Sequence, residues 1–491
     1  MAKDSKEQSF IKEITPRSED FSQWYIDIVR KAELADYTSM KGCMVIKPYG
    51  YAIWENMRDQ MDKRIKDTGH MNAYFPLFVP ESLLNKEAEH IAGFAPEVAW
   101  VTQGGNEKLE ERLAIRPTSE AIICSIYADW VHSWRDLPIL INQWANVVRW
   151  EKVTRLFLRT TEFQWQEGHT CHRTHEEAVE ETVKMLAVYK EYAENVLAMP
   201  AHAGIKTSNE RFPGAQETYC IEALMSDGKA LQAGTSHDLG QHFSKMFNIL
   251  FEDQDNERKY VWQTSWGTSM RMLGGVIMTH GDENGLILPP KIAPYQVVII
   301  PIFKAANKEE VCAKAQEVAA TLKAAGVRVF LDDREQYSPG WKYNQWEMKG
   351  VPLRLELGPK DIEKQTVFSA RRDTRVKAAI PMAQLTTAVP ELLNTIQNDM
   401  LQKAINFREE MTTKVDNFED FQKTIETKRG FVVAGWDGTT ETELKIKELT
   451  KATIRFIPMD ENFKPIPAPE GTKCVLTGEP AKHLVYFARS Y

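Results

Sequence analysis

Arginine, glutamate and aromatic residues are gathered in the segment Arg149–Thr170, RWEKVTRLFLRTTEFQWQEGHT. A guanidinium group can bind a phosphate through two parallel hydrogen bonds, and a carboxylate can accept a hydrogen bond from the amino group of adenine. Arg149 and Glu151, two positions apart in an extended segment, would project side by side. The pair is therefore suited to a nucleotide. On charge spacing alone, the alternative is a surface hairpin with solvent-exposed ion pairs, which are common and weak.

Two strands joined by a turn are predicted to present these side chains, because charged and apolar residues alternate with a period of two. One face would carry Val148, Trp150, Leu156 and Leu158, and the other Arg149, Glu151, Phe157 and Arg159. We therefore expect the nucleotide site on the charged face of a hairpin.

The same segment resembles, almost residue for residue, motif 2 of the class II aminoacyl-tRNA synthetases in the form found in the prolyl-tRNA synthetase family. The segment Arg116–Glu120, RPTSE, resembles the family's amino-acid-binding loop. The segment Ser265–Gly275, SWGTSMRMLGG, resembles motif 3, with Arg271 as its arginine. Further similar segments are GTSHDLGQHFS from Gly234, HGDENGLILPP from His280, and Ala488–Tyr491. The resemblance covers nearly the whole chain.

This resemblance implies an enzyme that activates L-proline with ATP to prolyl-adenylate and pyrophosphate, and then transfers proline to the 3′ end of tRNA(Pro). Catalysis of such a reaction depends on positioning and on cations that meet the charge of the phosphates. The family pattern places Arg149 at the α-phosphate, Glu151 at the adenine and Arg271 at the γ-phosphate of a bent ATP, with Mg²⁺ bridging the phosphates. Gln232 and Thr235 would complete the ATP site.

A proline pocket needs a cation for the carboxylate, acceptors for the secondary ammonium and an apolar wall for the ring. Arg159 is expected to hold the carboxylate, and Thr118 and Glu120 are expected to accept from the ammonium. Trp165 would supply the wall and also favour a nearby cation.

The family pattern adds Glu167, His169 and His237 to this pocket. For a single histidine the alternative is a structural role, and only the position within the motif favours binding for His169. Phe94 and Glu97, in GFAPEVAWVT, resemble a loop that closes over the site.

Length and composition limit the class of protein. A chain of 491 residues with 43% hydrophobic residues is expected to form two or three globular domains. It shows no apolar segment of signal-peptide length near Met1 and no apolar run near the ~20 residues of a membrane span, so we expect a cytoplasmic protein without membrane contact. Six cysteines without close spacing indicate reduced thiols. A net charge of −8 argues against indiscriminate nucleic-acid binding, although a local basic patch still suffices for tRNA.

Residues 1–289 are predicted to form an α+β catalytic domain of the class II synthetase type, with an antiparallel sheet flanked by helices. The segment Tyr51–Asp67 is predicted to be a helix that ends before Gly69. One face would carry Trp54, Met57, Met61 and Ile65. Periodicity alone indicates a helix packed on its own core. By resemblance, however, this is motif 1, which builds the dimer interface, so we expect a homodimer.

Residues 290–400 are predicted to form an α/β anticodon-binding domain. The expected elements are strands at Gln296–Phe303, Val327–Leu331, Val351–Leu357 and Thr366–Ala370 and a helix at Lys308–Ala325. A polar amphipathic segment, about Pro390 to Lys428, would then lead into a small C-terminal α/β domain, for which we predict residues 401–491.

The segment Ser338–Asp361 resembles the surface that reads the two guanines of a proline anticodon. Arginine, lysine and carboxylate side chains suit guanine edges. The candidates are Glu347, Arg354, Glu356, Lys360 and Asp361. For any one of them, a salt bridge within the domain is the alternative.

Many bacterial-type relatives carry an editing insertion between motifs 2 and 3. Only about sixty residues separate His172 from Gln232, too few for that domain, so we expect the archaeal and eukaryotic-type form without editing in cis. Discrimination against alanine would be imperfect, since a hydrophobic pocket gains only ~1–3 kcal/mol per methylene. Rapid hydrolysis of alanyl-tRNA(Pro) by the purified protein would contradict the expected absence of editing in cis.

The last domain resembles a zinc-binding type of extension that has lost its cysteines. Its segment FVVAGWDGTTETE, from Phe431, has none, and Cys474 stands alone in CVLT. A single thiolate does not make a four-ligand zinc site, so we expect no zinc on metal analysis. Apolar packing would replace it, by Phe431, Val433, Ile454 and Phe456. Tyr491 is expected to dock on the catalytic domain, because the apolar segment Val485–Phe487 precedes it.

Two other functions fit parts of the sequence. A non-catalytic synthetase paralogue would bind amino acid or RNA as a regulator, but such paralogues typically lose motif arginines, and this chain keeps Arg149, Glu151 and Arg271. A threonyl or seryl enzyme of class II is disfavoured by the Thr118–Glu120 loop and by FQWQEGHT. An amino-acid panel would distinguish them.

Overall fold

The computed structural model describes residues 14–86 and 98–491. A seven-stranded sheet is the centre of the molecule, and its strand order is β3-β7-β8-β14-β11-β10-β9. The strands are β3 (Met71–Asn72), β7 (Ile139–Val148), β8 (Glu162–His172), β14 (Trp262–Ser269), β11 (Ala230–Gly240), β10 (Glu217–Leu224) and β9 (Ala201–Ile205). All neighbours are antiparallel except β3 and β7. The predicted antiparallel sheet is confirmed, apart from this short parallel edge.

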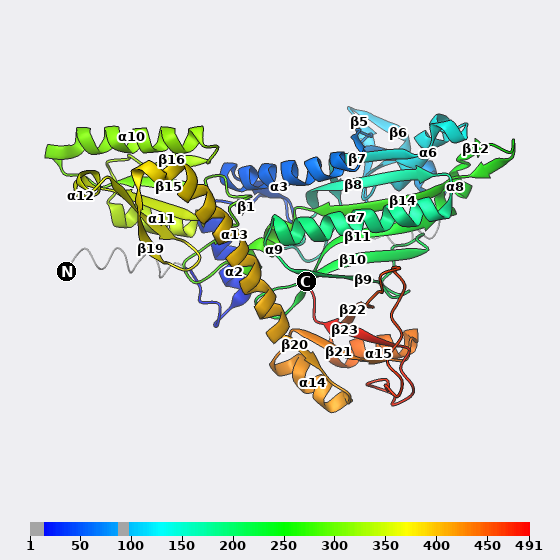
Figure 1. The fold of residues 1–491 in the computed structure, drawn as a ribbon. Coiled ribbons are helices and arrows are strands. Elements are labelled where there is room, and N and C mark those ends of the chain that lie inside the picture. The colour runs from blue at the N-terminus through cyan, green and yellow to red at the C-terminus, as the bar shows by residue number, and fades with distance from the viewer. Residues whose placement is uncertain (1–13, 87–97) are drawn as a thin grey trace.

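Helices cover the sheet and small sheets flank it (Figure 1). The helices of this part are α2 (Phe21–Lys31), α3 (Pro48–Asp67), α4 (Glu81–Leu84), α6 (Glu120–Trp130), α7 (His175–Asn195), α8 (His242–Phe247) and α9 (Arg271–His280), with a 3₁₀ turn η2 (Trp134–Asp136). The flanking strands are β1 (Ala35–Tyr37), β2 (Met44–Ile46), β4 (Phe78–Pro80), β5 (Ala99–Gly104), β6 (Glu107–Ile115), β12 (Leu250–Glu252) and β13 (Arg258–Tyr260).

Helix α3 agrees with its prediction. It ends at Asp67, and Gly69 follows in the left-handed conformation (φ +91°) that favours glycine. Its predicted apolar face is buried inside its own chain, with Trp54, Met57, Met61 and Ile65 at most 4% exposed. The tyrosine hydroxyl of Tyr192, on α7, donates to the carbonyl oxygen of Met57 at 3.0 Å. These four side chains therefore belong to the core.

The segment that carries Arg149 differs from the predicted hairpin. The strands β7 and β8 lie on either side of it, and residues 149–161 form the loop between them. Leu156, Phe157 and Leu158 are all buried, so the predicted alternation of two faces is wrong there. The reason is local, because Phe157 has a left-handed backbone (φ 62°), which breaks the pleat.

A second, five-stranded sheet has the order β16-β15-β17-β18-β19. Its strands are β15 (Val297–Pro301), β16 (Val329–Leu331), β17 (Leu353–Leu357), β18 (Thr366–Arg371) and β19 (Lys377–Pro381). Its helices are α10 (Lys308–Ala324), α11 (Pro339–Met348), α12 (Pro359–Glu363) and α13 (Leu385–Glu410), with 3₁₀ turns η3 (Ala305–Asn307) and η4 (Met382–Gln384). The predicted β-α-β order is confirmed, and the ends of the predicted strands and helix agree with the structure to within about two residues.

Helix α13 is a continuous 26-residue helix that runs from the second sheet past the first to a third (Figure 1). It contains Pro390, where the sequence predicted the start of the segment. Pro390 is the sixth residue of the helix and has no N–H to donate to the carbonyl oxygen of Thr386, so the helix continues with one backbone hydrogen bond missing. The helix is fixed midway, where the Gln397 amide donates to the carbonyl oxygens of Asn195 and Val196.

The third sheet has four strands in the order β20-β21-β23-β22. Its elements are β20 (Thr412–Lys414), α14 (Phe418–Thr427), β21 (Phe431–Trp436), α15 (Thr440–Thr450), β22 (Thr453–Phe456) and β23 (His483–Ala488). Phe431, Ile454 and Phe456 are buried as predicted, whereas Val433 is only half-buried.

Tyr491 docks on the catalytic domain, as predicted. Its hydroxyl donates to Asp227 Oδ2 at 2.7 Å, and its backbone N–H donates to the carbonyl oxygen of Ala230 at 3.2 Å. No helix within residues 14–86 and 98–491 combines the length and apolar character needed to cross a membrane. None of the six cysteines, all of which the structure describes, forms a disulfide.

Candidate active site

A cavity of about 360 Å³ lies on the face of the large sheet opposite α7. Along β8, and at Thr235 and His237 of β11, alternate residues line it. On β11, Thr235 and His237 face the cavity, whereas the hydroxyl of Ser236 donates to the carbonyl oxygen of Thr182 on α7. On β8, Trp165 lines the cavity, whereas the neighbouring Gln166 accepts from Tyr189 on α7.

All twelve residues predicted for ATP and proline line this cavity. They are Thr118, Glu120, Arg149, Glu151, Arg159, Trp165, Glu167, His169, Gln232, Thr235, His237 and Arg271. The structure thus brings together residues from four separate segments of the chain. Phe94 and Glu97, predicted to close over the site, lie outside the described residues.

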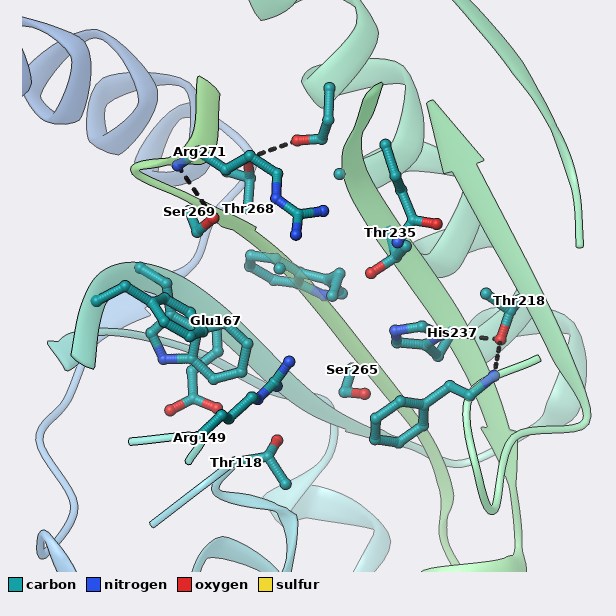
Figure 2. A pocket seen from close by; sticks show the side chains of 18 of the residues that line it. Thr118, Arg149, Glu167, Thr218, Thr235, His237, Ser265, Thr268, Ser269 and Arg271 are labelled. Carbon is teal, nitrogen blue, oxygen red and sulfur yellow. Dashed lines mark hydrogen bonds between the residues drawn. The ribbon is translucent and has the colours of Figure 1, made fainter. Parts of the chain in front are cut away.

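Two arginines from different elements point into the cavity (Figure 2). Arg149 follows β7, and its Nε donates to the carbonyl oxygen of Pro117 at 3.0 Å. Its guanidinium lies 5.4 Å from the ring of Trp165. Arg271 begins α9, and its Nε donates to the carbonyl oxygen of Leu158 at 3.0 Å. Both guanidinium groups are therefore oriented by backbone carbonyls.

The electrostatics of the cavity favour an anion. Burial lowers the pKa of Arg271, and the charges of Arg149 and Arg159 lower it further. An arginine stays protonated in a protein despite such a shift. Cations held close together in a partly buried site repel one another, and a bound polyphosphate would relieve that repulsion.

Glu151 and Arg159 form an ion pair across the loop, with Arg159 Nε 2.6 Å from Glu151 Oε2. The side chain of Arg159 is 53% exposed, so the pair is only weakly stabilising. Each partner was predicted to bind a different substrate. The pair therefore holds both groups near the cavity and is easily exchanged for substrate contacts.

A buried polar network surrounds Glu167. Its Oε1 accepts from Ser119 Oγ and from the Gln143 amide at 2.5 and 2.8 Å, and its Oε2 lies 3.0 Å from His169 Nε2. Burial opposes charge on both partners, but the hydrogen bond and charge of each outweigh it, lowering the pKa of Glu167 and raising that of His169. The pair is thus a fixed ion pair, with Glu120 also close enough to favour the histidinium.

His237 differs from His169 in its protonation, because burial lowers the pKa of His237 to about 4. It is therefore neutral at neutral pH. Its Nδ1 lies 3.0 Å from the Thr218 hydroxyl, and Phe212 stacks on its ring at a centroid distance of 4.5 Å. Nearby, the Thr118 hydroxyl donates to the buried Glu120 carboxylate.

The sequence did not predict part of the lining. The missed side chains include Phe163, Glu210, Arg211, Phe212, Thr218 and Ser265. Four residues of the β9–β10 loop, 210–213, line the cavity although the loop has neither periodicity nor a motif that signals it.

Three of the five anticodon candidates form one cluster, with Arg354 and Glu356 on β17 and Glu347 on α11. Arg354 donates to Glu347 Oε1 and to Glu356 Oε1, both at 3.0 Å, and its guanidinium lies 3.9 Å from the ring of Tyr343. Asp361 is separate, because it accepts from the Gly358 N–H and caps α12. Lys360, also on α12, is exposed.

Three family models match the chain. They are "tRNA synthetase class II core domain (G, H, P, S and T)" over residues 100–280, "Anticodon binding domain" over 296–392 and "Prolyl-tRNA synthetase, C-terminal" over 418–491.

Similar proteins match over the full length. Proline–tRNA ligase of Natranaerobius thermophilus is 56% identical, and proline–tRNA ligase 2 of Clostridioides difficile is 55% identical, each with 100% of both chains covered. The crystal structure of prolyl-tRNA synthetase from Cryptosporidium parvum, complexed with halofuginone and AMPPNP, superposes with a TM-score of 0.93 at 45% identity. The superposition covers 98% of the chain described here and 99% of the Cryptosporidium parvum chain.

Proposed function

Because the chain belongs to the prolyl-tRNA synthetases, which join proline to tRNA, we propose that the cavity on the large sheet binds ATP and L-proline side by side. The observation that carries the proposal is the convergence of Arg149 and Arg271 with the network of Glu167 and His169 in one cavity. The segment between His172 and Gln232 is occupied by α7, β9 and β10 of the catalytic domain itself, in keeping with a form without an inserted editing domain.

Arg149 is assigned to the α-phosphate and Arg271 to the γ-phosphate, with Glu151, Gln232 and Thr235 toward the nucleoside. The carboxylate of proline attacks the α-phosphorus, and pyrophosphate leaves in line with it. Arg149 then stabilises the negative charge that develops on the α-phosphate oxygens, because its guanidinium is already oriented by the carbonyl of Pro117.

The proline end is assigned to side chains around Thr118, which lies across the cavity from Arg271 (Figure 2). The members are Thr118, Glu120, Arg159, Trp165, Glu167, His169 and His237. A neutral His237 and the indole of Trp165 suit the apolar ring, and the carboxyl oxygens of Glu120 suit the ammonium. Because Glu167 is neutralised by His169, its role is to fix the shape of the pocket.

Mg²⁺ is proposed to enter with ATP. Within residues 14–86 and 98–491, no three His, Cys, Asp or Glu side chains form a metal-binding group. Mg²⁺ in nucleotide sites usually binds one or two carboxylates together with phosphate oxygens and water. Among the residues that the structure describes, the cavity lining has carboxylates but no cluster of three metal ligands, so it fits an ion of this kind. When bound, the ion would neutralise phosphate charge alongside Arg149 and Arg271.

The proposal is tested by amino-acid-dependent exchange of pyrophosphate into ATP with Mg²⁺, across the twenty amino acids. Proline should give the strongest exchange and alanine or cysteine a weaker one, since their side chains are small enough to enter the pocket but bury less apolar surface than the proline ring. Exchange that is stronger with threonine or serine would contradict the assignment of the pocket.

A second copy of the chain is proposed to bind beside β3. The apolar face of α3 is used inside its own chain, but Met71, Tyr74 and Phe78, shortly after the helix, are 70%, 73% and 45% exposed. Several exposed apolar side chains within one short segment are typical of interfaces. A molar mass in solution of a single chain would contradict the dimer.

Since translation consumes the product, the cytoplasm is the expected location.

The cluster around Arg354 is proposed to read the anticodon. Arg354→Ala is expected to lower kcat/KM for tRNA(Pro) by roughly 10- to 100-fold, because a guanidinium contact to guanine is worth ~1–3 kcal/mol. Exchange of pyrophosphate without tRNA should be unchanged, since the cluster lies on a different sheet from the cavity. Loss of both activities together would indicate that Arg354 acts on the fold and not on tRNA.

A further inference from the structure

The loop between β9 and β10 forms one wall of the active-site cavity. Phe212 stacks on His237, with ring centroids 4.5 Å apart and planes inclined by 29°. The backbone N–H of Phe212 donates to the Thr218 hydroxyl at 3.0 Å, and that hydroxyl also contacts His237. The position of Phe212 therefore determines how closely this wall approaches a bound amino acid.

The third sheet's helix α15 holds the first half of this loop. Glu443, only 4% exposed, accepts from the Thr207 hydroxyl with one carboxylate oxygen and from the Asn209 amide with the other, both at 2.7 Å. The partners lie more than 230 residues apart in the sequence. Loss of the carboxylate would leave the Thr207 hydroxyl and the Asn209 amide without this partner, and the cost is larger for the hydroxyl, because Thr207 is buried whereas Asn209 is exposed.

The base of the loop is fixed by the same domain. The backbones of Ile205 and Ile457 exchange two hydrogen bonds, of 3.0 and 2.8 Å, at the edge of the large sheet. Next to them, Lys206 Nζ contacts Glu222 Oε1 and the carbonyl oxygen of Arg455, both at 2.8 Å. Figure 1 shows the third sheet lying against the β9 edge. The loop thus starts from a rigid base, and Glu443 sets the direction it takes next.

We propose that Glu443 is a positioning residue for the amino-acid site: it holds Thr207 and Asn209 so that Phe212 is pressed against His237 and closes the pocket over the ring of proline. This inference rests on the proposed assignment of that part of the cavity to proline. The C-terminal domain, which carries Glu443, contributes no side chain to the described lining of the cavity. Through Glu443 it nevertheless sets the affinity for proline and the selectivity against alanine.

The test is Glu443→Ala in the full chain, assayed by pyrophosphate exchange with proline, alanine and ATP varied in turn. The KM for proline should rise about tenfold, in line with the loss of hydrogen bonds to a buried charge, while the KM for ATP stays within about twofold. The ratio of kcat/KM for proline to that for alanine should fall, because alanine has no ring for Phe212 to cover. Glu443→Gln keeps the shape of the side chain and one acceptor oxygen. Its KM for proline should therefore lie between those of the wild type and Glu443→Ala.

The matched control is Glu448→Ala on the same helix, because Glu448 is exposed and pairs with Lys445 at the surface. It should leave all three KM values unchanged. If Glu443→Ala instead raised the KM for proline and ATP alike, or left both unchanged, the positioning role would be refuted.

A double-mutant cycle with Phe212→Ala separates this inference from the proposed function. If Glu443 acts through Phe212, Glu443→Ala should add little to the effect of Phe212→Ala, because the two changes remove one interaction. Independent, multiplying effects would overturn the inference. If neither Phe212→Ala nor Arg159→Ala changed the KM for proline, the assignment of the pocket itself would be wrong.

Discussion

Arg149→Ala is expected to lower proline-dependent pyrophosphate exchange by about 100- to 1,000-fold, the range typical for loss of one oriented donor at a developing charge. The effect should appear mainly in kcat, because the guanidinium meets charge that grows in the transition state. Its guanidinium is oriented by the Pro117 carbonyl and lies beside the Trp165 ring, so the substitution removes a donor that is already fixed in place. Steady-state exchange kinetics with saturating ATP and proline measure this loss.

Lys152→Ala is the appropriate control for Arg149→Ala. Lys152 is an exposed cation on the same loop and does not line the cavity. Its removal changes the net charge of the loop equally but should leave exchange without tRNA unchanged. If both variants lost activity to the same degree, the general charge of the loop would be responsible, and the assignment of Arg149 to the α-phosphate would not hold.

Arg159→Ala should act on the other substrate. We expect kcat/KM for proline to fall about 100-fold, since a guanidinium–carboxylate contact has two charged hydrogen bonds. The KM for ATP should stay the same or decrease, because Glu151 is released from its ion pair with Arg159 and is available to the nucleotide. Separate titrations of proline and ATP distinguish these effects. A higher KM for ATP with an unchanged KM for proline would reverse the assignment of Arg159.

Most of the site was predictable because its residues lie in short, ordered sequence motifs. Twelve candidates from such segments line one cavity, although they are far apart in the chain. The helices α3 and α10 were also predictable, since regular apolar spacing ends at Gly69 and Gly326, both of which adopt positive φ. In these places, local sequence and tertiary structure agree.

The errors have local physical causes. The alternation around Arg149 suggested strands, but Phe157 takes a left-handed conformation and turns three consecutive apolar residues inward. Pro390 suggested a boundary, but the helix continues through it with one backbone hydrogen bond missing, because its apolar face is buried on both sides of the proline. In both cases a pattern of residue types was consistent with more than one backbone path.

The contacts of Phe212 and Glu443 could not be predicted in this way. Phe212 lies in a loop without periodicity, and Glu443 is one of several glutamates on an amphipathic helix. Only the folded structure places Glu443 against Thr207 and Asn209, and no local propensity contains that information. Residues that act on a site from another domain are generally beyond the reach of motif reading for this reason.

The buried ion cluster at the base of the β9–β10 loop limits how such enzymes can be recombined. Glu222 comes from the catalytic half of the chain and Arg455 from the C-terminal domain, and both are at most 6% exposed. A chimera that joins one relative's catalytic half to another's C-terminal domain would inherit half of this cluster from each parent. Where the parents differ there, a buried charge would lose its partner, which typically destabilises a protein by ~3–5 kcal/mol. The two domains are therefore best treated as a single inherited unit, and a crossover point placed between them should be chosen only among parents that share both residues.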